Sequence, residues 1–344
     1  MSLRTSAPPS YARSRMIDRI MRGLMVMATL VAVVPLVLIL GYVIVRGGQA
    51  LSVDFFTQTY RPPLAVNDAS MAVPAEPAPV DPLAPTADPA DPFAGIDIGG
   101  LAGAETTDPA AGAQQTDLAA ETPQGGVLHG IVGTLMITGL SLLIAIPIGI
   151  LAGVFLSEFP NNVVATVVRF ACDVLSGAPS IVIGVVGYVL IVQRFQAFSG
   201  IAGSVALTFL MVPTITRTTE EILKLVPQST REAALAMGAP MWYGTFTVVI
   251  PAALAGIITG VLLAFARGAG ETAPLILTVL GNNDFSLDMF KAIAALPLMT
   301  YRYTESPFPA ENTLAWGTAL VLVMLVLGVN ILVRIATRSK LKGR

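Results

Sequence analysis

An arginine and a glutamate four residues apart interrupt an otherwise apolar stretch in the C-terminal half of the chain. Arg267 and Glu271 follow the uncharged run 248–266. A charge at the centre of a spanning helix costs about 2.5–3.5 kcal/mol on insertion scales, so the arginine should face a partner or a wet cavity. A guanidinium can bind an oxyanion with its planar fork while a carboxylate orients it, and Gly268 and Gly270 allow close approach. The pattern predicts a path for an anion, a mutual salt bridge, or both.

A second candidate is the polar segment that precedes this run. Ser229, followed three residues later by Glu232, matches the capping box that begins a helix. Gly238 can adopt a positive φ where that helix ends. Trp242 and Tyr243 follow, and exposed aromatic residues commonly mark an interaction site. We expect a short helix that either inserts into a groove on another protein or lies at the membrane interface.

A glycine and a proline break a third segment. Gly177 and Pro179 interrupt the run 163–192, which would be about 45 Å long as one helix, and proline removes a backbone hydrogen bond. Freed backbone groups are tolerated at membrane depth only inside protein or beside water. The break is therefore expected to face the pathway or a partner helix. Before it, Arg169 and Asp173 are expected to form an i,i+4 pair worth a few tenths of a kcal/mol.

The composition indicates a membrane protein. Of 344 residues, 54% are hydrophobic and 12% charged, with a mean hydropathy of +0.74, whereas soluble domains carry about 25% charged residues. A net charge of −2 gives no reason to expect a nucleic-acid partner. With Cys172 and His129 as the single cysteine and histidine, no disulfide framework, metal site or cofactor is expected. The sequence has no G-x-x-x-x-G-K-[ST] loop for ATP phosphates, so we predict no enzymatic activity of this chain.

Six stretches qualify as membrane spans, each needing about 20 mostly apolar residues. They are residues 23–45, 131–157, 180–192, 195–216, 248–266 and 312–333. The predicted fold is an all-α membrane protein with six transmembrane helices. The predicted organisation is a basic N-terminus (1–22), a first transmembrane helix (23–46), an acidic Pro/Ala-rich loop (47–126), a transmembrane domain (127–337) and a basic tail (338–344).

The basic residues predict the orientation. With the N-terminus inside and alternating spans, 14 basic residues lie on the inner side and five on the outer side, with Arg267 in the membrane. Both termini are therefore expected in the cytoplasm and the loop 47–126 outside. That loop holds 11 acidic residues against Arg61 alone, so we expect disorder. Its role stays open between a docking arm and a tolerated insertion.

The polar segment also carries a family resemblance. Its spacing is Glu232-Ala233-Ala234, three residues, Gly238, nine residues, Val248, one residue, Ile250 and Pro251. This spacing resembles the E-A-A-x3-G-x9-I-x-L-P loop of ABC importer permeases, with apolar substitutions at Val248 and Ile250. The resemblance implies the type I (MetI-like) architecture and a coupling helix near 229–246. In that family the loop, here residues 232–251, docks on the ATPase subunits.

Two further stretches narrow the resemblance. Residues 170–182 (FACDVLSGAPSIV) and 267–275 (RGAGETAPL) are similar to segments of the permeases of bacterial phosphate importers. The resemblance covers roughly residues 127–337. It implies a multi-pass protein of the bacterial inner membrane whose partners are a second permease (PstC), an ATPase dimer (PstB) and an extracytoplasmic phosphate-binding protein (PstS). Phosphate would pass between the two permeases, beside Arg267 and Glu271.

Two alternatives remain at this stage. The coupling loop alone also fits a permease for another oxyanion, such as sulfate or molybdate. Glu271 favours phosphate modestly, because a carboxylate could accept a hydrogen bond from protonated phosphate whereas sulfate has no proton to give. A membrane receptor or structural protein that binds a cytoplasmic partner without transport is the other alternative.

Overall fold

The computed structural model describes residues 9–60 and 125–341, and its secondary structure there is helical, with π-helical turns η2 and η3 and one isolated backbone bridge. Within the loop 47–126 that was predicted to be disordered, residues 53–57 form a helix with Phe55 buried, and residues 61–124 lie outside the described residues. The helices are α1 (Pro9–Gly48), α2 (Val53–Thr57), α4 (Leu128–Glu158), α5 (Val163–Gly177), α6 (Ser180–Gly187), η2 (Tyr188–Val192), α7 (Gln193–Phe195), α8 (Gly200–Lys224), α9 (Gln228–Ala236), α10 (Met241–Gly244), η3 (Thr245–Val249), α11 (Ile250–Ala269), α12 (Ala273–Thr278), α13 (Leu296–Glu305) and α14 (Pro309–Leu341).

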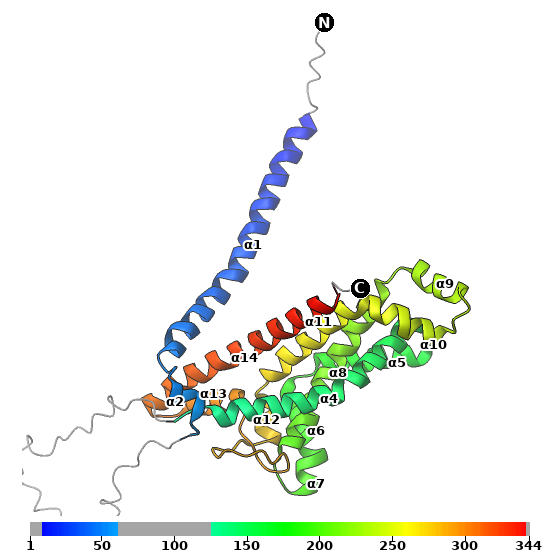
Figure 1. Cartoon of the computed structure of the whole chain (residues 1–344). Helices are drawn as coiled ribbons and strands as arrows, with labels where there is room; N and C mark the ends of the chain where they lie inside the picture. Colours follow the sequence, from blue (N-terminus) through cyan, green and yellow to red (C-terminus); the bar gives the residue numbers. More distant parts are fainter. Residues whose placement is uncertain (1–8, 61–124, 342–344) are drawn as a thin grey trace, which may run out of the picture.

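Helices α4 and α8 form the centre of the structure and run side by side in the same direction (Figure 1). The Ser141 hydroxyl donates to the carbonyl oxygen of Ser204 at 2.9 Å, and the Ser204 hydroxyl donates to that of Ile137 at 3.1 Å. Nearer the C-terminal ends of the two helices, a Cβ added to Gly153 of α4 would lie 2.6 Å from Cβ of Thr219 of α8. Small and hydroxyl-bearing residues thus let two long apolar helices pack closely, as is typical of membrane helices.

Three clusters of buried apolar side chains connect the other elements to this pair. The central cluster joins Leu207 of α8 to Leu275 of α12. The second cluster lies at the end that carries α2 and α13 and contains Phe55 and Tyr303. The third lies at the opposite end, near α9, and contains Leu223 of α8. We call these two ends the α13 end and the α9 end.

Helix α1 leaves the rest of the structure and touches it only near its last turns (Figure 1). The rings of Tyr42 and Trp316 meet edge to face with centroids 4.9 Å apart, and Gly47 lies against the carbonyl oxygen of Trp316. The apolar side chains before this contact, such as Leu36 and Leu38, are exposed. A helix that is apolar all round and unburied suits a lipid environment.

The predicted spans agree with the helices except for the fourth. Among the described residues, five helices are long and apolar enough to cross a membrane, and a bent pair could supply a sixth. The fourth span was predicted over 195–216, but α8 runs from Gly200 to Lys224. Gln196 has a left-handed φ of 53° that ends α7, and the Ser199 side chain accepts a hydrogen bond from the Ala202 N–H at 3.2 Å to begin α8. Arg217 therefore belongs to this long helix, not to a loop.

The predicted break forms between α5 and α6, which meet at an angle of 104°. Ala178 and Pro179 are extended, with ψ values of 137° and 133°, so the helix cannot continue. After the bend, a Cβ at Gly184 would meet Cα of Pro274 at 2.8 Å, which shows how closely α6 approaches α12. The break itself is exposed in this chain at Gly177 and Pro179, and a Cβ at Gly177 would meet nothing within 4 Å, so its expected contact with a partner helix or the pathway stays a prediction.

Candidate functional site

The segment predicted to couple to a partner forms helix α9, which projects from the α9 end, and helix α10, which continues through η3 into α11 (Figure 1). Helix α9 has no buried residue, and the side chains that follow it are exposed, Met237 at 87% and Trp242 at 66%. The rings of Trp242 and Tyr243 contact edge to face at 5.7 Å. The site thus presents large apolar side chains away from the rest of the chain.

The two ends of α9 differ from each other in how well they were predicted. Gly238 has φ +79° and its N–H donates to the Leu235 carbonyl oxygen at 2.9 Å, so the predicted glycine stop is confirmed. The predicted capping box is wrong, because the N-cap is Pro227 and α9 makes no side-chain cap hydrogen bond. Proline fixes φ near −65°, and the N-cap lies two residues before the predicted one, which puts Ser229 inside the first turn.

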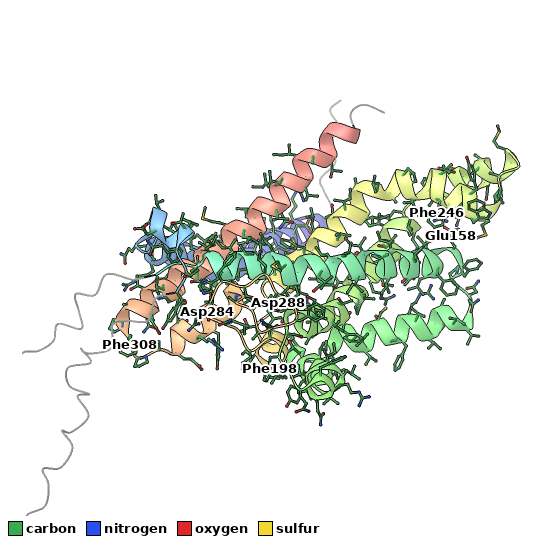
Figure 2. All side chains as sticks on the ribbon, turned by 60° about the horizontal axis from the view of Figure 1, so that its bottom comes forward. Glu158, Phe198, Phe246, Asp284, Asp288 and Phe308 are labelled. Carbon is green, nitrogen blue, oxygen red and sulfur yellow. The ribbon has the colours of Figure 1, made fainter. Side chains whose placement is uncertain are left out.

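Sequence reasoning missed one residue of this segment, Arg231. Its Nη1 forms an ion pair with Glu158, the last residue of α4, and its Nη2 donates to the Leu223 carbonyl oxygen of α8 at 2.9 Å. The Ser157 hydroxyl lies 3.5 Å from the same Nη2. Figure 2 shows Glu158 at the same end of the molecule as Phe246, which belongs to η3. The only sequence signal for a role of Arg231 was its position next to Glu232, because nothing in the sequence indicates that its partner is Glu158, 73 residues away.

A cavity lies beneath α9, between this helix and the ends of α4 and α8. It has a volume of about 360 Å³. The lining includes Glu158, Lys224, Arg231, Glu232 and Leu235. The inner face of α9 is therefore not closely packed against the long helices.

A buried carboxylate joins α5 and α8 near the same end. Glu220 is 1% exposed, and its oxygens lie 2.7 Å from Arg169 Nε, 3.0 Å from Arg217 Nη1 and 2.6 Å from Lys224 Nζ. The predicted pair of Arg169 with Asp173 is therefore wrong, because Asp173 pairs with Arg217 at 2.8 Å. A buried carboxylate requires charged partners, and the longer α8 places Glu220 within reach of Arg169.

The candidate substrate pair lies toward the other end of α11. Arg267 is 17 residues beyond Ile250, about 25 Å along the helix. Its Nε lies 3.5 Å from Glu271 Oε1, and the side chains are 41% and 19% exposed. The structure thus brings Arg267 and Glu271 together, near the C-cap at Gly270, and leaves the guanidinium accessible for a further ligand. Among the described residues, no three His, Cys, Asp or Glu side chains are placed to hold a metal ion.

The long apolar helices and the projecting helix α9 are the features to compare with known membrane proteins. Residues 145–341 match the family described as binding-protein-dependent transport system inner membrane component. The chain belongs to this family and has the architecture of a type I ABC importer permease, a multi-pass component of the inner membrane.

Three proteins similar to this chain are phosphate permeases. The chain is 44% identical over 222 residues to the phosphate transport system permease protein PstA of Haemophilus influenzae, covering 64% of this chain and 79% of that one. It is 43% identical over 220 residues to PstA of Yersinia pestis, covering 64% and 75%. Identity to PstA 1 of Mycobacterium tuberculosis H37Rv is 39% over 210 residues, covering 60% and 68%.

A solved structure shares the fold. An inward-facing form of the MetNI methionine ABC transporter superposes with a TM-score of 0.52 at 22% identity, covering 62% of this chain and 95% of that chain. This likeness concerns the arrangement of the helices.

Proposed function

We propose that this chain is the transmembrane permease subunit of an ATP-driven importer of inorganic phosphate. The observation that carries the proposal is the similarity to PstA proteins, 44% identical over 222 residues. The partners proposed with it are the second permease PstC, the ATPase dimer PstB and the phosphate-binding protein PstS. The chain would line the translocation path together with the second permease.

The coupling role is proposed for α9 and the segment after it. The helix has no buried residue, yet large apolar side chains follow it at Met237 and Trp242. An exposed apolar surface on a short rigid helix suits a groove on another protein. We propose that Glu232, Ala233, Ala234, Gly238 and Pro251 serve this coupling to the ATPase.

The substrate path is proposed to pass Arg267 and Glu271. An anion that leaves its receptor loses water and needs replacement donors. The 3.5 Å separation between Arg267 Nε and Glu271 Oε1 allows the carboxylate to orient the guanidinium while other N–H groups bind phosphate. Gly177 and Pro179 are proposed to give the bent pair α5 and α6 its place beside this path.

The orientation is proposed from the basic residues, with both termini in the cytoplasm and the loop 47–126 outside. Single cysteines at Ser6, Ala87 and Ser339, in a chain whose Cys172 is replaced, test it with an impermeant thiol reagent. The Ala87→Cys variant should react in spheroplasts, which expose the outer face of the inner membrane. Reaction of Ser6→Cys or Ser339→Cys under the same conditions would contradict the orientation.

Transport is tested by reconstituting the four subunits in proteoliposomes with radiolabelled phosphate. ATP-dependent uptake that sulfate and molybdate do not compete with is expected. Uptake of sulfate or molybdate instead would favour another oxyanion, and recovery of a complex without ATPase subunits would favour a receptor.

The role of Arg267 is tested in the same system. Arg267→Gln removes the charge and the fork and should abolish uptake, whereas Arg267→Lys keeps the charge and should reduce it. Glu271→Gln should be milder if the carboxylate only orients Arg267. Arg194, an exposed arginine on α7, supplies the control Arg194→Gln. Normal uptake by Arg267→Gln at equal expression would remove Arg267 from the path.

A further inference from the structure

Apart from the backbone at its two ends and its contact with α10 and η3, helix α9 reaches α4 and α8 through one side chain. It has no buried residue, and Arg231 alone among its nine residues makes a side-chain hydrogen bond or ion pair. The cavity of about 360 Å³ beneath the helix means that apolar packing does not fix it there. A force applied to α9 therefore has few routes into the membrane helices.

The contacts of Arg231 with α4 and α8 form a rigid connection. The Arg231 guanidinium pairs with Glu158 through Nη1 and donates to the Leu223 carbonyl oxygen through Nη2, so it holds α4 and α8 at once. The side chains of Arg231 and Glu158 are 15% and 9% exposed, so the pair is largely shielded from water. A planar fork with two partners on different helices resists rotation better than a single point charge does.

The last turn of α4 is held from its other side as well. Arg169 Nη2 donates to the Leu156 carbonyl oxygen at 2.8 Å, and Arg169 Nε lies 2.7 Å from Glu220. Arg169 belongs to α5, the helix that ends at the 104° break before α6. The residues Leu156 to Glu158 thus lie between a contact from α9 and a contact from α5.

We infer that Arg231 and Glu158 are positioning residues that transmit the movement of α9 to the last turn of α4. From there, Arg169 passes the displacement to α5 and the broken pair. The inference rests on the proposed function, in which an ATPase moves α9. Transmission thus depends on one ion pair rather than on the whole interface between α9 and the long helices.

The test measures phosphate transported per ATP hydrolysed by the four-subunit complex. Arg231→Gln and Glu158→Gln should each lower this ratio about tenfold, within the range of typical coupling free energies, while ATP hydrolysis and assembly persist. Arg231→Lys should keep part of the ratio, because it retains the charge without the fork. The double variant should lose no more than either single variant, because both remove the same link.

Glu221→Gln in α8 is the matched control, since its side chain is exposed, and it should keep the wild-type ratio. A wild-type ratio in either single variant of the pair, or additive losses in the double variant, would overturn the inference. If Arg231→Gln does not assemble, Arg231→Lys and Glu158→Gln decide in the same way.

A second measurement separates this inference from the proposed function. Hydrogen exchange of the amides of residues 228–236 in the purified permease should be faster in Arg231→Gln than in Glu221→Gln, whatever the substrate. Equal exchange would contradict the link. Absence of ATP-dependent phosphate uptake by the wild-type complex, with faster exchange in Arg231→Gln, would contradict the proposed function alone.

Discussion

Arg169 Nε lies 2.7 Å from Oε1 of Glu220, across 51 residues of sequence, and this ion pair joins the helix before the break to the central helix α8. Lys224 donates to the same oxygen at 2.6 Å, while Arg217 contacts the other oxygen at 3.0 Å. One carboxylate thus organises three cations on two helices. Its removal leaves charges that Asp173 alone cannot balance.

Glu220→Gln is expected to destabilise the protein. Breaking a buried ion pair from one side costs about 3–5 kcal/mol, and partial exposure of the three cations reduces the expected loss to about 2 kcal/mol. The thermal melting of the purified permease in detergent measures it. Glu221→Gln, at an exposed neighbour, is the control, and equal melting temperatures of the two variants would contradict the role of Glu220.

The effect of a substitution at Gly238 should depend on the backbone conformation there and not on the space available to a side chain. A Cβ there meets nothing within 4 Å, but φ is +79°. Gly238→Val should therefore cost about 1 kcal/mol or more locally, whereas Gly238→Asn should be mild, since asparagine tolerates this region. ATP-driven phosphate uptake should fall in the valine variant with membrane insertion intact. Equal uptake by the two variants would show that the turn is not needed.

The contact between α4 and α8 at Gly153 should not tolerate a large side chain. A Cβ would lie 2.6 Å from Cβ of Thr219 and 2.7 Å from the Thr216 carbonyl oxygen, so the two backbones would have to separate. Gly153→Leu is expected to cost about 1–3 kcal/mol. A Cβ added to the exposed Gly139 of the same helix would meet nothing within 4 Å, so Gly139→Leu should melt like the wild type. A wild-type melting temperature for Gly153→Leu would refute the close packing.

The stabilisation that the Tyr60 hydroxyl provides should depend on pH in the alkaline range. Its hydroxyl donates to Glu311 at 2.8 Å, and burial together with this carboxylate raises the pKa of Tyr60 from 10.0 to about 12. Since the folded pKa lies above the unfolded one, the stabilisation is full below pH 10 and is lost as the pH rises through 12. Ultraviolet titration should show one phenol that ionises near pH 12 and is missing in Tyr60→Phe. An unchanged titration curve in that variant would contradict the assignment.

The helices were largely predictable, because long uncharged runs have few alternatives in a membrane. The error at the start of α8 has a local cause, since Gln196 adopts a left-handed conformation that an apolar count cannot detect. The far end of α8 was missed because Arg217 and Glu220 resemble loop residues until their partners are known. Charges four residues apart suggest a local pair, and only the fold shows that Arg169 reaches α8 instead.

The site was predicted unevenly for the same reason. Gly238 was predictable because its backbone requirement is local, and Arg267 with Glu271 because the pair is local too. The role of Arg231 could not be predicted because it depends on the ion pair with Glu158. Residue spacing within one helix does not indicate a partner at the end of another helix.

Tyr60 and Gly125 form an antiparallel backbone bridge, so the chain leaves and re-enters the permease at one point. The two ends of the segment 61–124 are therefore held next to each other. Doubling the length of a flexible loop costs only about 0.6 kcal/mol in closure entropy. Residues 61–124 could therefore change in length or sequence without moving Tyr60 or Gly125. A reporter domain could be inserted there for the same reason.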